Sequence, residues 1–214
     1  MKMLLESLLL ALILSNLVLL GSTRVRNYVK VIALQGFILG LLTLLLHLGA
    51  LSIHTLLLSG GSILLKSLVF PWLLIRAIRE ADVHASVEPF VGYNASLIIG
   101  VLLLPFCFWL ASRLPAQLMP TMASSLPIAL FTMASGLFLI VARKKALTQV
   151  VGYLVLENGI YVSALALVGE IPWIVELGVL LDIFVAVFVM GIALYQINRE
   201  FDHIYTDQLS SLKG

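Results

Sequence analysis

The sequence has few charged residues and almost no cysteine. Only 11% of its 214 residues are Asp, Glu, Lys or Arg, whereas soluble domains carry about 25%. By contrast, 61% of the residues are hydrophobic and the mean hydropathy is +1.12. The single cysteine, Cys107, excludes an internal disulfide and any multi-cysteine metal or iron–sulfur site. The net charge of +2 is too small to indicate a nucleic-acid partner, and the apolar excess is typical of an integral membrane protein.

Motifs of enzymes that break covalent bonds are also absent from the sequence. It contains no glycine-rich phosphate loop, no HExxH pair and no nucleophile elbow. We therefore expect neither a catalytic site nor a bound cofactor in this chain. Any part that it takes in an enzyme is then that of a non-catalytic subunit.

Long apolar runs recur along the whole chain. About 20 apolar residues cross a hydrocarbon core of roughly 30 Å, and lipid offers no partner to an open backbone N–H, so each run predicts a helix. The first run has only Lys2 before it and no small-residue cleavage pattern after it, which favours a retained span over a signal peptide. The sequence thus predicts an all-α integral membrane protein. The seven transmembrane helices are expected at residues 3–21, 29–49, 54–77, 94–112, 126–142, 146–168 and 173–196.

Lysine and arginine in the short loops predict the orientation of the chain in the membrane. With seven spans, ten basic residues fall on one face and two on the other. We therefore expect a multi-pass membrane protein with the N-terminus outside and the C-terminus in the cytoplasm. The ten are Arg24, Arg26, Lys30, Arg76, Arg79, Arg143, Lys144, Lys145, Arg199 and Lys213; the two are Lys2 and Arg113.

The two ends of the chain resemble each other. Basic turns at Arg24 and Arg143 each lead into a span with a polar residue part-way along, Gln35 in one and Glu157 in the other. This pattern predicts two three-helix repeats joined by a linker helix, unless it is only the likeness that any two apolar triplets share. The expected division is 1–80 for the first repeat, 81–125 for the linker with the fourth helix, 126–200 for the second repeat and 201–214 for a cytoplasmic tail.

Three ionisable residues are predicted deep inside the spans. Lys66 lies about twelve residues, or roughly 18 Å, into its span, which is too deep for its ammonium to reach water. Glu157 and Asp182 are also expected near the midplane, where a charge costs at least about 2.5–3.5 kcal/mol. Carboxylates in such surroundings can accept and release protons near neutral pH, so the three residues predict a proton relay. The alternative is a static ion pair, within the chain or with a neighbouring subunit.

Further titratable residues are expected near the outer face. Glu176 lies one to two turns outward from Asp182 and is either a member of the relay or a hydrated interfacial group. His47 and His54 flank the predicted turn between the second and third helices, where side chains that titrate near neutrality suit the end of a proton path. The alternative for both histidines is a plain interfacial role.

Several stretches of the chain resemble a known family. Residues 144–145, 152–159 (GYLVLENG), 172, 175–178, 181–187 and 212–214, with Lys66 and 68–71, closely resemble hydrogenase-4 component E. That family comprises membrane subunits of formate-hydrogenlyase-type and other group 4 membrane-bound nickel–iron hydrogenases. Residues 156–165 also look like subunit K of respiratory complex I, which has an essential glutamate in each of two helices. The first glutamate matches Glu157; the second falls nearer Ala186, one turn beyond Asp182.

The resemblance implies a non-catalytic membrane-arm subunit of a complex I-like energy-converting complex in the prokaryotic cell (inner) membrane. Such a subunit lies beside antiporter-like membrane subunits and is coupled through the membrane arm to a peripheral redox module. Two alternatives remain open: a scaffold that joins antiporter-like subunits, and part of a Na⁺/H⁺ antiporter-type assembly. An independent secondary transporter is less favoured, because apart from Gly60 and Gly61 the spans show few of the paired Gly or Pro breaks of a midplane substrate site.

Overall fold

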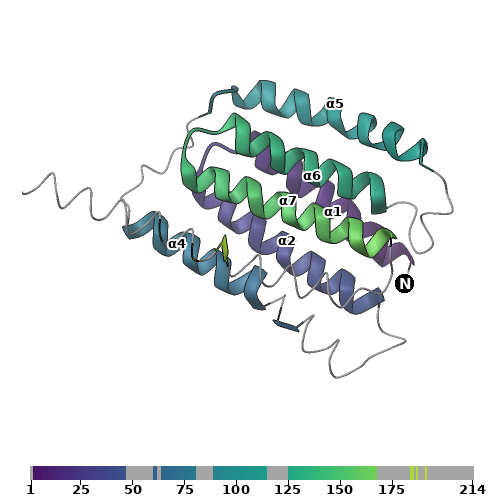
Figure 1. Cartoon of the computed structure of the whole chain (residues 1–214), viewed down its shortest axis with the longest axis horizontal. Coiled ribbons are helices and arrows are strands. Elements are labelled where there is room, and N and C mark those ends of the chain that lie inside the picture. Colours follow the sequence, from purple (N-terminus) through teal and green to yellow (C-terminus); the bar gives the residue numbers. More distant parts are fainter. Residues whose placement is uncertain are drawn as a thin grey trace, which may run out of the picture.

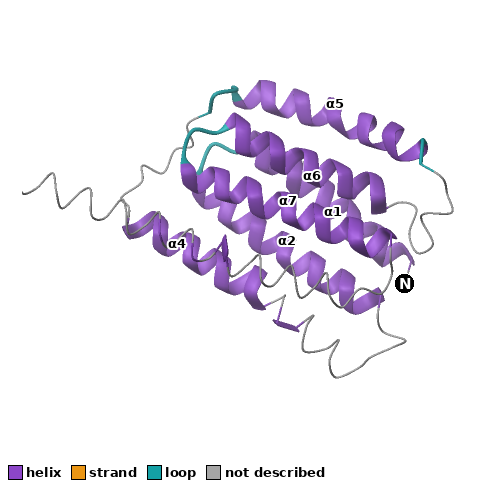
Figure 2. Cartoon of the chain, viewed as in Figure 1, coloured by secondary structure: helices purple, strands orange, loops and turns teal. Residues whose placement is uncertain are grey.

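The structure is a computed structural model that describes residues 2–46, 60–61, 64–80, 89–114, 125–167, 184–185, 187 and 191. Within these ranges every regular element is a helix (Figure 2). The elements are α1 (Lys2–Gly21), α2 (Val25–Leu46), the π-helical turn η1 (Leu65–Val69), α4 (Phe70–Glu80), α5 (Tyr93–Ser112), α6 (Ser125–Ala142) and α7 (Ala146–Leu167).

Five of these helices are long and apolar enough to cross a membrane: α1, α2, α5, α6 and α7. They confirm the predicted spans at 3–21, 29–49, 94–112, 126–142 and 146–168 to within a few residues. The chain is therefore an all-helical membrane protein in the part that the structure describes. The predicted seventh span, 173–196, lies almost wholly outside the described residues, so the count of seven and the repeat remain predictions.

The start of α2 differs from the prediction by four residues. The helix begins at Val25, so Arg26 and Lys30, expected in or near a loop, lie in its first two turns. Both are exposed, whereas Tyr28 and Val29 are buried. The helix can therefore continue into this basic stretch, because one face packs against the bundle while the other presents its charges to water.

The predicted third span, 54–77, corresponds in the described residues to η1 and α4. Here the helix widens just before Pro71, and the N–H of Phe70 donates to the carbonyl of Leu65, five residues earlier. Proline supplies no N–H, and in a regular α-helix its ring would clash with the carbonyl four residues back, that of Ser67. A wider turn relieves this conflict, which explains the π geometry around Lys66.

The helices lie side by side along their lengths (Figure 1). In the bundle α6 and α7 form an antiparallel hairpin, α1 and α2 pack beside it, α5 covers α1 and α6, and η1 with α4 lies against α2. Gly136, Gly152 and Gly159 lie at the contact of α6 with α7, where an added methyl group would meet the backbone of the other helix. Small residues let membrane helices approach this closely.

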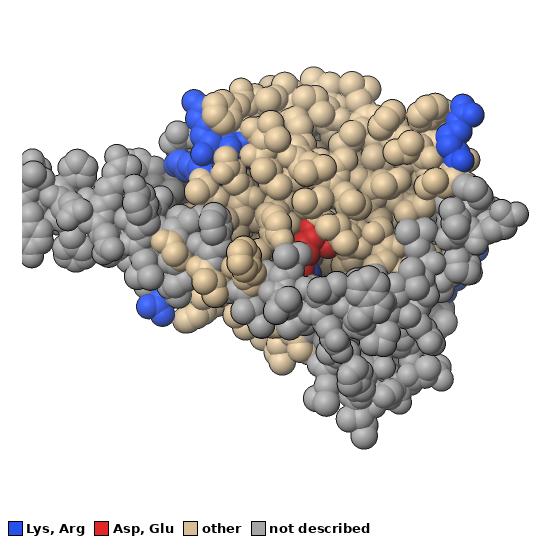
Figure 3. Space-filling model, viewed as in Figure 1, with Lys and Arg blue, Asp and Glu red and all other residues tan. Residues whose placement is uncertain are grey.

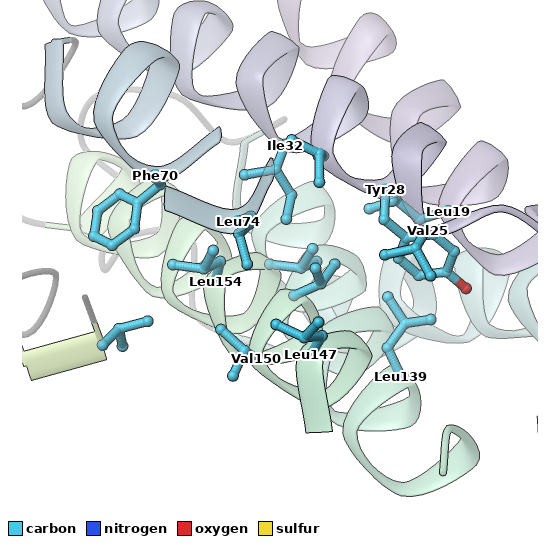
Figure 4. Close-up of a cluster of buried hydrophobic side chains, with 14 of the residues drawn as sticks. Leu19, Val25, Tyr28, Ile32, Phe70, Leu74, Leu139, Leu147, Val150 and Leu154 are labelled. Atoms are coloured by element: carbon cyan, nitrogen blue, oxygen red, sulfur yellow. The ribbon is translucent and has the colours of Figure 1, made fainter. Parts of the chain in front are cut away.

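Two hydrophobic clusters form the core, and polar residues separate them. One cluster lies toward the α6–α7 turn and includes Leu19, Tyr28 and Leu154 (Figure 4). The other lies toward the opposite end and includes Leu12 and Phe131. Between them along four helices lie buried polar residues, which we call the polar layer: Ser15 and Asn16 of α1, Gln35 of α2, Thr132 of α6, and Glu157 and Asn158 of α7.

The outer surface of the described helices is mostly apolar. Large side chains such as Leu102, Trp72 and Val141 are exposed on it. In Figure 3 uncharged residues cover most of the described part of the visible face, basic residues lie toward its ends, and an acidic group is visible near its middle. This distribution matches a lipid-facing belt between two polar boundaries.

Candidate functional site

A buried ion pair joins η1 to the middle of α7. The Lys66 ammonium donates to Glu157 Oε1 at 2.7 Å. Only 7% of Lys66 and 4% of Glu157 is exposed. Glu157 is eleven residues after the first residue of α7, about 16 Å along the helix and so near half the thickness of a hydrocarbon core. The pair therefore places two ionisable groups next to each other and away from bulk water.

The second oxygen of Glu157 is also buried. Oε2 has no hydrogen-bond partner among the described residues. A buried carboxylate oxygen usually has a partner, because desolvation without one is costly. Glu157 can thus accept a proton or a further hydrogen bond at Oε2 while Oε1 remains paired with Lys66.

The ring of Tyr161 also lies next to the lysine ammonium. The Lys66 ammonium lies 5.6 Å from the centre of its ring. Glu157 and Tyr161 are four residues apart on α7 and so share one face of that helix. The Tyr161 hydroxyl is hydrogen-bonded to Thr43 Oγ1 of α2 at 2.8 Å, which fixes the ring from the neighbouring helix.

Gly36 allows η1 to approach α2 closely enough to form this site. A methyl group on Gly36 would lie 2.8 Å from both the carbonyl carbon and Cβ of Lys66, closer than real Cβ contacts. The backbone of Lys66 therefore packs directly onto α2, and its side chain crosses to Glu157 on α7. The π turn and this glycine together set the position of the ammonium.

A chain of hydrogen bonds joins four helices beside the ion pair. Gln35 donates to Ser15 Oγ at 2.8 Å and to Asn16 Oδ1 at 2.9 Å. Its carbonyl oxygen accepts from Asn158 at 3.2 Å, and Asn16 donates to Thr132 at 2.8 Å. Interhelical amide and hydroxyl bonds of this kind fix the register of membrane helices. Because Gln35 precedes Gly36 and Asn158 follows Glu157, the same register brings Lys66 to Glu157.

A second buried cation, Arg143, lies at the end of the bundle that holds the α1–α2 and α6–α7 turns. It is 0% exposed. Its guanidinium donates to the carbonyls of Leu20 at 2.9 Å and Val91 at 3.1 Å, to the Tyr28 hydroxyl at 3.1 Å and to Ser96 Oγ at 3.4 Å. Leu20 belongs to the last turn of α1, where a cation is favourable. Arg143 thus ties together α1, α2, α5 and the α6–α7 turn.

The structure brings together two of the residues predicted for the relay, Lys66 and Glu157. The other four predicted residues, Asp182, Glu176, His47 and His54, lie outside the described residues. Within the described ranges, no three His, Cys, Asp or Glu side chains gather closely enough to hold a metal ion.

Sequence reasoning missed the part played by Tyr161, Thr43 and Arg143. Tyr161 follows Glu157 by four residues, so helical spacing alone could have placed the two on one face. Thr43 and Arg143 offered no such signal, because their partners belong to distant helices.

Comparison with known proteins identifies a relative that matches almost the whole chain. The uncharacterized protein Rv0085 of Mycobacterium tuberculosis is 32% identical over 207 residues, which are 94% of this chain and 92% of that protein. This chain belongs to the Rv0085 family. No family model matches it. No solved structure gives a significant match.

This member of the Rv0085 family is also similar to proteins whose names state a function. Hydrogenase-4 component E of Escherichia coli K12 and that of Shigella flexneri are each 25% identical to it over 156 residues. The match covers 73% of this chain and 72% of each relative. These distant relatives thus support the resemblance to hydrogenase-4 component E that the sequence indicated.

Proposed function

We propose that this chain is a membrane subunit of a hydrogenase-type multisubunit complex, in which the Lys66–Glu157 pair takes part in moving protons across the membrane. The observation that carries the proposal is the pair itself, which is buried midway along α7 with the Tyr161 ring against the Lys66 ammonium. We propose that the same proton path includes four further residues: Asp182, Glu176, His47 and His54.

The energetics of buried ion pairs support a functional reading. Removing two charges from water costs several kcal/mol per ion, and well-packed hydrophobic residues often stabilise a protein as much as or more than the pair does. Stability alone therefore gives little reason to place Lys66 and Glu157 between two hydrophobic clusters. A group that must change its proton occupancy during turnover gives a direct reason.

The similar proteins support membership of a hydrogenase-type complex. Hydrogenase-4 component E is named as part of a hydrogenase, and this chain matches it over 73% of its length. We infer that the partners are antiporter-like membrane subunits and, through them, a peripheral redox module. The resemblance of residues 156–165 to subunit K of complex I favours Glu157 as the essential acid.

Membership of a complex is tested by tagging the chain in its native membrane. Mild detergent extraction followed by mass spectrometry is expected to recover further polytopic membrane subunits together with a soluble redox module. Recovery of the chain without any such subunit would contradict the proposal. Recovery of ion-antiporter subunits without a redox module would instead favour the antiporter-type assembly.

The role of the pair is tested with Glu157→Gln in the same complex, reconstituted into vesicles with pH-sensitive and sodium-sensitive dyes. Glutamine keeps the size and hydrogen-bonding shape of the side chain but cannot carry the negative charge. We expect redox turnover to remain measurable and ion movement to be lost. Glu6→Gln is the matched control, because Glu6 is exposed on α1.

The two main readings give different results in this experiment. A relay loses ion movement while the complex stays assembled. A scaffold whose charges only hold helices together loses assembly, and any complex that survives pumps normally. Unchanged pumping in an intact Glu157→Gln complex overturns the relay.

A further inference from the structure

Tyr161 has a place at the ion pair that neither the sequence motifs nor the relatives assign. Its ring faces the Lys66 ammonium at 5.6 Å, on the same face of α7 as Glu157. The lysine therefore lies between a carboxylate and an aromatic ring. The ring is 8% exposed, so its interaction with the cation is sheltered from water.

The ring is held in place from a second helix. Its hydroxyl is hydrogen-bonded to Thr43 Oγ1 at 2.8 Å, and Thr43 in turn bonds to the Leu39 carbonyl at 2.9 Å. Both Thr43 and Leu39 belong to α2. Because α2 also carries Gly36 against the backbone of Lys66, the same helix positions both the lysine and the ring.

The pair has two forms that differ in charge. In one, Lys66 is an ammonium and Glu157 a carboxylate; in the other, the proton has moved from nitrogen to oxygen and both groups are neutral. The negative face of an aromatic ring attracts a cation, so Tyr161 stabilises only the form with the ammonium. The Lys66 ammonium contacts both the Glu157 carboxylate and the Tyr161 ring, while Gln35 and Asn158, which are hydrogen-bonded to each other beside the pair, are neutral amides.

We propose that Tyr161 is a positioning residue that keeps the Lys66–Glu157 pair in its charged form through the face of its ring. The proposal rests on the proposed function, since the charge state of the pair matters most if the pair moves protons. Tyr161 itself neither gains nor loses a proton in this role. Its effect is to set how readily the proton leaves Lys66 for Glu157.

The test uses the full-length chain in lipid and infrared spectroscopy of the neutral carboxylic acid of Glu157, a band assigned by its loss in Glu157→Gln. Position 161 is replaced by phenylalanine and then by phenylalanines with one, two and three ring fluorines. Each fluorine weakens the negative face of the ring while the side chain keeps its shape, so folding is preserved across the series. Fluorinated phenylalanine at Phe138, in the hydrophobic cluster near the α6–α7 turn, is the control.

We expect the Tyr161→Phe variant to keep nearly the native band, because it retains the ring face. The ratio of neutral to ionised Glu157 at neutral pH should then rise with each fluorine, by about tenfold over the series. The Phe138 series should leave the band unchanged. If the ratio of neutral to ionised Glu157 does not change across the fluorine series at position 161, the inference is overturned. It is also overturned if Tyr161→Phe alone changes this ratio as much as the trifluorinated residue does.

The failure of this inference is distinguishable from that of the proposed function. A flat fluorine series together with lost pumping in Glu157→Gln removes the role of Tyr161 and leaves the relay. A graded series together with normal pumping in Glu157→Gln leaves the role of Tyr161 and removes the relay.

Discussion

The Lys66 ammonium and the Glu157 carboxylate lie 2.7 Å apart, and both are nearly inaccessible to water. Each charge is therefore stabilised by the other. Removing one partner from a buried pair leaves an uncompensated charge, whereas removing both leaves an apolar contact. The two kinds of variant therefore separate the effect of charge from the effect of packing.

We predict that Lys66→Met lowers the stability of the chain by about 3–5 kcal/mol, because Glu157 is left buried without its cation. The double variant Lys66→Met with Glu157→Leu should recover most of that loss, since neither charge remains. Unfolding in detergent, followed by circular dichroism, gives both values. A double variant no more stable than Lys66→Met would mean that the ion pair does not account for the loss.

At this scale the sequence indicated Lys66 and Glu157 as ionisable residues within apolar spans, whereas their direct contact was not predicted. Counting residues along a helix gives the height of a side chain in the membrane, whereas its direction depends on how the helices turn toward one another. The contact depends on the wide turn before Pro71 and on the close approach at Gly36. The Pro71 signal was present in the sequence, since a proline disfavours regular helix in the turn before it.

At the scale of elements, the approach of η1 to α2 determines the geometry of the site. We predict that Gly36→Ala destabilises the chain by about 1–3 kcal/mol, because the new methyl group overlaps the backbone of Lys66. The displaced lysine should also weaken the pair, which appears in the infrared spectrum as an increase in neutral Glu157.

Gly92→Ala serves as the control for this prediction. Gly92 precedes α5, and an added methyl group there meets no atom within 4 Å among the described residues. If Gly36→Ala proved as stable as Gly92→Ala, the close packing of η1 on α2 would be excluded as a constraint on the site.

Arg143 joins the ends of several elements through one side chain. We predict that Arg143→Lys destabilises the bundle by at least about 2 kcal/mol, because a single ammonium cannot reach both the Leu20 and Val91 carbonyls and the Tyr28 hydroxyl. Arg113→Lys, at an exposed position just after α5, should have little effect. Equal melting temperatures for the two variants would show that Arg143 is not needed to hold the helix ends together.

The sequence had indicated Arg143 as one positive charge among ten on one face and as part of a basic turn before a predicted span. Its burial was not predictable, because it results from α1, α2, α5 and the α6–α7 turn converging at one end of the bundle. Pro89 forms an isolated antiparallel β-bridge with Arg143, and the Phe90 N–H donates to the Ala142 carbonyl at 2.8 Å. The chain just before α5 is therefore part of the same junction.

At the scale of the whole molecule, the α1–α2 turn, the α6–α7 turn and the start of α5 lie at one end (Figure 1). This grouping is what the distribution of basic residues predicted for one membrane face. The direction of the bundle in the membrane remains a prediction.

We predict that this end is cytoplasmic. Because Cys107 is the single cysteine, a Cys107→Ser background allows one new cysteine at a time. Cysteines at Thr23 and Lys144 should react with a membrane-impermeant maleimide in inverted vesicles and not in intact cells, and a cysteine at Arg113 should do the reverse. The opposite labelling pattern would place the N-terminus inside.

The polar layer between two hydrophobic clusters is the feature of the whole molecule that the sequence pattern did not predict. Gln35 was noticed as a polar residue within a span, but its bonds to Asn16 and Asn158 join helices far apart in the chain. The hydrogen bonds of the layer hold α1, α2, α6 and α7 in register beside the ion pair.

The most direct measurement is the number of protons moved per pair of electrons by the purified complex that carries the double variant Lys66→Met with Glu157→Leu. This variant is expected to fold and assemble, so loss of function cannot be assigned to instability. A relay through the pair predicts electron transfer at a measurable rate with proton movement reduced or abolished. An unchanged number of protons per pair of electrons would contradict the account.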